Sequence, residues 1–164
     1  MSYSRQTVCS LAGIDVDRFK VLARRGQNIA WLQEGEDGEA FDPYERRPPI
    51  SGFQALLLAI QTELTLPAGM LDGLSPPDAY QIVNNNAHAV HEAVKSREPY
   101  FIGYAGDPQD GRAGGFQLFG SFAEVAAMVA SKGGNPARVT LVNVSRVYQA
   151  VLDRAAVLGI EFAL

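Results

Sequence analysis

Four basic side chains form the group in this sequence that is best suited to bind another molecule. Arg18, Lys20, Arg24 and Arg25 all lie within residues 13–26. Guanidinium and ammonium groups pair with phosphates, and they also donate hydrogen bonds to base edges in the major groove of DNA. The group therefore indicates contacts with a nucleic acid, whereas an ordinary solvated helix face is the alternative interpretation.

The positive charge is confined to the start of the chain. Residues 1–33 carry five basic and two acidic residues, a net charge of +3, whereas residues 34–45 carry six acidic residues and no basic one. The remainder has nine basic and ten acidic residues, so the 164-residue chain has a net charge of −4. This balance argues against a protein that coats nucleic acid without regard to sequence.

A helix is expected to present the basic residues. Asp15 is a good N-cap, because its carboxylate accepts a backbone N–H that the first turn leaves free. Gly26 suits a left-handed C-terminal cap, and Phe19, Val21 and Leu22 are expected on the buried side. A shorter helix is expected before it, ending at Gly13.

The exposed side of the helix from Asp15 supplies the candidate DNA contacts. We expect Arg18 and Lys20 to face the groove, with Asp17 beside them as an acceptor for cytosine. Phosphate contacts are assigned to the other basic residues. The full set of DNA-binding candidates is Arg5, Asp17, Arg18, Lys20, Arg24 and Arg25.

Residues 11–26 resemble the helix-turn-helix of the MerR-like and phage-excisionase-like winged regulators. Gly13 matches the turn glycine, Ile14 the buried aliphatic residue and Asp15 the helix cap of that pattern. The resemblance covers about residues 5–65 and implies a wing hairpin followed by another helix. A hairpin over residues 29–41, turning at Asp37-Gly38, would be this wing. Because it is acidic, it would face a protein partner or fold away from DNA.

The rest of the chain predicts an α+β fold. Ser51 and Gln54 form a capping box for a helix that continues to Leu64, and Ser75 caps a helix that continues to Ser96. A small α/β layer of order β-β-α-β-α-β follows: strands 100–105 and 115–120, a helix 121–132, strand 138–144, a helix capped by Ser145, and strand 160–163. The expected divisions are a winged helix-turn-helix (1–66), a linking or dimerisation helix (67–98) and a small α/β domain (99–164).

Other residues with chemical potential give weaker patterns. His88, His91 and Glu92 share a helix face, but no third or fourth zinc ligand accompanies them, and we predict no metal and no cofactor. The loop 106–115 contains Asp107, Asp110 and Arg112, which are candidate ligand-binding residues, and a plain long hairpin loop is the alternative. Cys9 is expected to be a small buried apolar residue.

These observations favour a sequence-specific, DNA-binding transcriptional regulator over an enzyme. One helix-turn-helix buries little DNA, so a homodimer on duplex DNA is expected, with a protein partner or small-molecule effector at the C-terminal domain. No apolar run approaches the roughly 20 residues of a membrane span, and the cytoplasm is the expected location. The alternatives are a phage-type DNA packaging or assembly component and a small-molecule-binding α/β protein.

Overall fold

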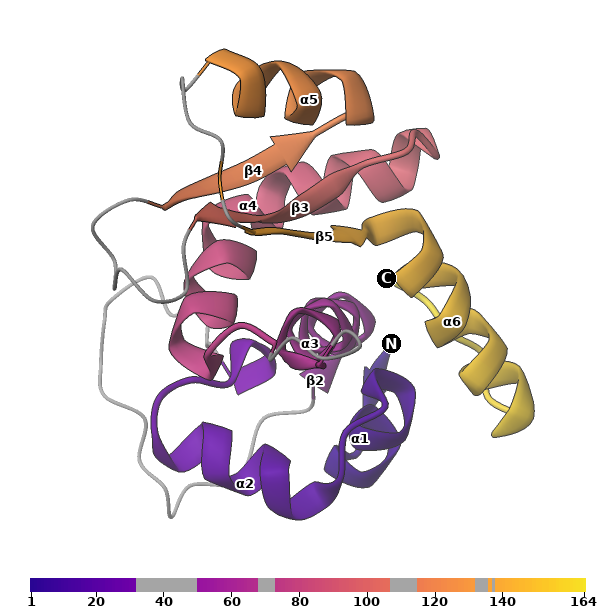
Figure 1. Ribbon diagram of the computed structural model, residues 1–164. Coiled ribbons are helices and arrows are strands. Elements are labelled where there is room, and N and C mark those ends of the chain that lie inside the picture. The colour runs from indigo at the N-terminus through magenta and orange to yellow at the C-terminus, as the bar shows by residue number, and fades with distance from the viewer. Residues whose placement is uncertain (32–49, 68–72, 107–114, 132–135, 137) are drawn as a thin grey trace, which may run out of the picture.

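The computed structural model describes residues 1–31, 50–67, 73–106, 115–131, 136 and 138–164, and it has the expected α+β character (Figure 1). Helices surround one long buried helix, and a three-stranded antiparallel sheet lies beside them. The expected α+β class is therefore confirmed.

The buried helix α3 (Gly52–Thr65) organises the fold. Ten of its fourteen residues are buried, so it is apolar on nearly all sides, as a helix enclosed by other elements must be. Its N-terminus is the predicted capping box: the Ser51 hydroxyl accepts from the Gln54 N–H, and the Gln54 Oε1 accepts from the Ser51 N–H at 2.8 Å.

Three further helices pack directly on α3. They are α1 (Arg5–Ala12), α4 (Pro76–Ser96) and α6 (Val144–Val157). The predicted start of α4 is confirmed, because Ser75 is its N-cap and prolines occupy its first turn. One cluster of buried residues extends from Tyr3 to Ala155 and includes Ile102 and Val142 of the sheet. The three-part division of the chain remains a prediction.

The sheet contains β3 (Phe101–Gly106), β4 (Phe116–Gly120) and β5 (Arg138–Asn143) in the order β4-β3-β5. Ile102 lies opposite both Phe119 and Val142; Ile102 and Val142 join the main core, whereas Phe119 is exposed. The other face packs Ala105 and Leu118 against α5 (Phe122–Ser131), which begins at a capping box formed by Ser121 and Glu124. The sheet therefore separates α5 from the main core.

A short antiparallel pair near the start of the chain was not predicted. β1 (Ser2–Tyr3) pairs with β2 (Ile50–Ser51). The Tyr3 hydroxyl donates to the Glu161 carbonyl oxygen at 2.9 Å and accepts from the Ala163 N–H at 3.0 Å. The last residues are thereby held against the first.

Three predictions about local structure are corrected. Residues 29–31 form a 3-10 turn, η1 (Ile29–Trp31), in place of the first arm of the hairpin, and residues 32–41 lie outside the described residues. Asn143, not Ser145, is the N-cap of α6, because its side chain accepts from the Arg146 N–H. Residues 160–163 form no strand: the Tyr3 hydroxyl bonds to the Glu161 carbonyl oxygen and to the Ala163 N–H, and the Ile160 N–H donates to the Ala155 carbonyl oxygen.

Within the described ranges, no helix combines the length and the apolar character required to cross a lipid bilayer.

Candidate nucleic-acid interface

A three-residue turn joins α1 to α2 (Val16–Arg24). Gly13 has φ 68°, a left-handed conformation that other residues rarely adopt, and the Ile14 N–H returns to the Cys9 carbonyl oxygen at 3.0 Å. Arg154 of α6 closes the turn, because its Nη1 donates to the Leu11 carbonyl oxygen at 3.0 Å. A two-helix unit joined by a short glycine turn is the local geometry that the sequence predicted.

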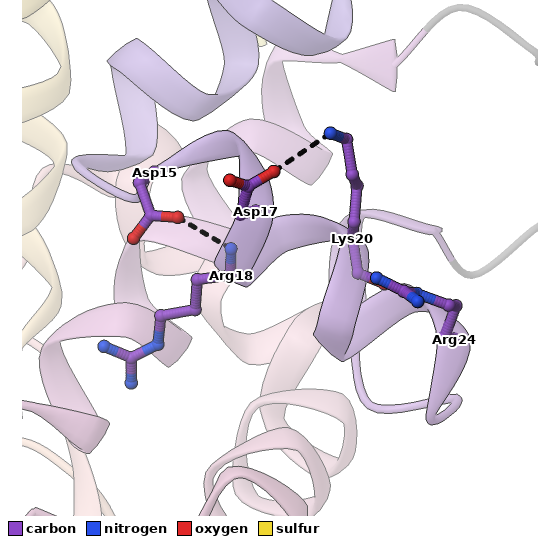
Figure 2. A network of polar contacts seen from close by, with 5 residues as sticks. All are labelled: Asp15, Asp17, Arg18, Lys20 and Arg24. Atoms are coloured by element: carbon purple, nitrogen blue, oxygen red, sulfur yellow. Dashed lines mark hydrogen bonds and ion pairs between the residues drawn. The ribbon is translucent and has the colours of Figure 1, made fainter.

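Both ends of α2 have the expected caps. The Asp15 carboxylate accepts from the Arg18 N–H at 2.7 Å (Figure 2). At the other end Gly26 has φ 63°, and the Gln27 N–H donates to the Leu22 carbonyl oxygen at 2.9 Å. The local sequence therefore correctly predicts both ends of α2.

The buried side of α2 differs from the prediction at one residue. Phe19 and Leu22 are buried, as expected, but the side chain of Val21 is 38% exposed. Residues three and four apart share a helix face, so Val21 lies on the same side as Asp17 and Arg24. The outward face of α2 therefore contains one apolar side chain among charged ones.

Buried amides fix the segment after α2 to its surroundings. Asn28 donates from Nδ2 to the Phe19 carbonyl oxygen at 3.3 Å, and its Oδ1 accepts from the Ala30 N–H. Gln61 of α3 accepts from the Ile29 N–H at 3.1 Å and donates to the Gln27 carbonyl oxygen. Because these N–H groups already have partners, this segment turns where a hairpin strand was predicted.

Arg18 is directed toward α3. Its Nη2 donates to the Thr65 hydroxyl at 2.8 Å, and the residue is half-buried. Figure 2 shows its side chain extending away from Lys20 and Arg24. Arg18 thus joins the start of α2 to the end of α3.

The remaining charged candidates of α2 lie on its surface. The Lys20 Nζ is 3.0 Å from the Asp17 carboxylate, and both side chains are exposed (Figure 2). The Arg24 Nε donates to the Lys20 carbonyl oxygen at 3.5 Å, and Arg25 is exposed at the helix end. The structure therefore brings Asp17, Lys20 and Arg24 together, with Arg25 beyond them.

Two residues of α1 face inward: the DNA-binding candidate Arg5 and the cysteine Cys9. The Arg5 guanidinium carbon lies 5.9 Å from the centre of the Phe19 ring, within the range of a cation–π contact. Cys9 is buried, as predicted, and burial with a smaller effect of the Asp15 charge raises the pKa of its thiol to about 11. The thiol is therefore protonated at neutral pH.

The weaker sequence candidates form no site in the described residues. The His91 Nδ1 is 3.3 Å from the Glu92 carboxylate and the His91 ring packs edge-on against Phe53, while His88 is exposed. No group of three or more His, Cys, Asp or Glu is placed to hold a metal in the part of the chain that the structure describes. The three ligand candidates of the loop lie outside that part: Asp107, Asp110 and Arg112.

Sequence reasoning missed the residues that hold α2 in place. They come from three separate parts of the chain, and no local pattern connects them: Asn28 after α2, Gln61 and Thr65 in α3, and Arg154 in α6. The exposure of Val21 was predictable from the sequence. Val21 is four residues from Asp17 and three from Arg24, so it shares a helix face with two charged residues.

No family model, curated protein or solved structure matches this chain.

Proposed function

We propose that the chain is a sequence-specific DNA-binding regulator whose helix α2 enters the major groove of duplex DNA. The observation that supports this most is the placement of α2: it is joined to α1 by a three-residue glycine turn, and it displays Lys20, Arg24 and Arg25 on its outer side. A helix has the width that the major groove admits, and its basic side chains pair with phosphates and guanine edges.

The contacts of α2 refine the roles of the candidates. Lys20 and Arg24 face the groove, and Arg25 contacts a phosphate at the helix end. Arg18 acts through Thr65 as an anchor of α2, because its guanidinium is engaged with α3. Asp17 neutralises part of the Lys20 charge and thereby weakens binding to phosphates of any sequence.

Removal of single charges from α2 tests the proposal. Duplex DNA selected from a random library by the full chain is titrated by fluorescence anisotropy at several salt concentrations. Lys20→Ala, Arg24→Ala and Arg25→Ala are each expected to weaken binding, and a lost phosphate contact lowers the slope of log affinity against log salt by about 1. Asp17→Asn is expected to strengthen binding to unselected DNA.

Arg146→Ala is the matched control, because Arg146 is an exposed residue near the sheet end of α6. It removes the same charge and should leave affinity and salt slope unchanged. Equal weakening by Arg146→Ala and Arg24→Ala would contradict the assignment of α2, and an absence of selected DNA would reject the function itself.

The proposed regulator acts as a homodimer on a two-fold-related site. Two copies of α2 would then enter successive major grooves about 34 Å apart. The mass in solution and the symmetry of the selected DNA check this: a dimer on a palindrome is expected. A ring of many subunits would instead favour a packaging or assembly component.

A further inference from the structure

The one apolar side chain on the outward face of α2, Val21, is partly exposed to solvent. Val21 is 38% exposed, whereas Phe19 and Leu22, which hold α2 to the core, are almost completely buried. Lys20 precedes it and Arg24 follows one turn later, and these two are joined through the contact of Arg24 Nε with the Lys20 carbonyl oxygen. Val21 therefore lies next to Lys20, Arg24 and Asp17 on the surface proposed to meet DNA.

The chemistry of the major groove offers one apolar partner to such a side chain. Among the four base edges exposed there, only thymine carries a methyl group, at its C5 position. Valine suits this contact, because a β-branched side chain in a helix keeps one strongly preferred χ1 rotamer and loses little freedom on binding. Its flanking cations would hold the helix close enough to the bases for the contact to form.

We propose that Val21 determines specificity by packing against the C5-methyl group of a thymine in the bound duplex. This inference rests on the proposed function and adds the base that the target must contain. Lys20 and Arg24 then supply affinity and position, while Val21 distinguishes thymine from cytosine and from uracil, which lacks the methyl group.

Replacement of thymine by uracil isolates the proposed contact, because only a methyl group is removed. Duplexes selected by the full chain are resynthesised with each thymine changed in turn to uracil. At one thymine of each half-site, the change should weaken binding of the native protein about fourfold, as expected for one buried methyl group. With Val21→Ala, thymine and uracil duplexes should bind equally at that position.

Val139→Ala is the matched control, because Val139 is exposed to a similar extent, 44%, but lies in β5. It should keep the full preference for thymine. Thermal unfolding of both variants checks that they fold, which is expected for exposed positions.

The outcomes separate the two proposals. Selected DNA that binds with no uracil-sensitive thymine would overturn the role of Val21 and leave the DNA-binding proposal standing. A uracil effect that persists in Val21→Ala would also overturn it, because another residue would then contact the methyl group. A failure to select any DNA would reject the proposed function, and this inference with it.

Discussion

Helices α2 and α5 are both short, capped surface helices, yet they are attached to the molecule in different ways. Figure 1 shows them at opposite ends, with α2 below the buried helix α3 and α5 above the sheet. Helix α2 is held by buried Phe19 and by polar contacts from α3, whereas α5 packs on the sheet with Val125 as its one buried residue.

The charges of the two helices differ as well. Helix α2 displays Asp17, Lys20 and Arg24, while α5 carries Glu124 as its one charged residue. Directional polar contacts fix the orientation of a helix more closely than apolar packing on one side, and charges define which partners it attracts. The comparison shows that α2 is fixed by polar contacts to α3 and carries exposed charges, whereas α5 covers one face of the sheet.

Loss of the Gln61 amide should break the attachment of α2 most severely. Gln61→Leu keeps the size of the side chain but leaves the Ile29 N–H and the Gln27 carbonyl oxygen without these partners. Unsatisfied buried polar groups destabilise by about 1–3 kcal/mol each, so urea denaturation should show a loss of roughly 2–4 kcal/mol. The control is Gln149→Leu, at an exposed residue of α6, which should change stability little. Similar small effects of Gln61→Leu and Gln149→Leu would contradict the conclusion that polar contacts hold α2 in place.

The stability of the folded protein should also fall at alkaline pH because of the buried Cys9 thiol in α1. Its pKa of about 11 in the folded state lies above the ordinary value of 9.0, so between these values the unfolded chain has lost the thiol proton and the folded one retains it. Stability is then complete below pH 9 and falls as the pH rises toward 11, by about 2–3 kcal/mol from this group. Urea denaturation from pH 8 to 11 measures the fall, and Cys9→Ala should show a smaller one. Identical pH profiles would exclude a contribution from the thiol.

A smaller effect is expected at the other end of the molecule. Val125→Ala removes two methyl groups from the contact between α5 and the sheet, which should cost about 1–2 kcal/mol. Hydrogen exchange should become faster in the α5 amides and stay unchanged in α2, with DNA affinity unaffected. Faster exchange in both helices would mean that the two attachments are coupled.

The parts of the fold that were predictable depend on neighbours in the sequence. Asp15, Ser51 and Ser75 each cap a helix by accepting an N–H three residues later, and Gly13 has the left-handed conformation that ends α1. Such local contacts leave a pattern in the residue types.

Two of the errors arise where distant residues satisfy the backbone. The Gln61 side chain, 32 residues away in the sequence, accepts a hydrogen bond from the Ile29 N–H. A segment with strand-forming residues therefore forms a turn. Tyr3 satisfies groups of Glu161 and Ala163 from the other end of the chain, and no strand is needed there. For the candidate interface, the sequence identified the cationic helix, but the engagement of Arg18 with Thr65 depends on how α2 packs against α3.

The contact of Tyr3 with the last residues has a consequence for engineering. Because the Tyr3 hydroxyl lies 3.0 Å from the Ala163 nitrogen, the backbones of residues 3 and 163 are separated by little more than one tyrosine side chain, a gap that a short peptide linker between residues 1 and 164 can span to give a circular backbone. A closed ring has fewer conformations when unfolded, so the cyclic form should melt at a higher temperature. New ends could then be opened in another surface connection, which would give a permuted chain with α2 still presented in the same orientation.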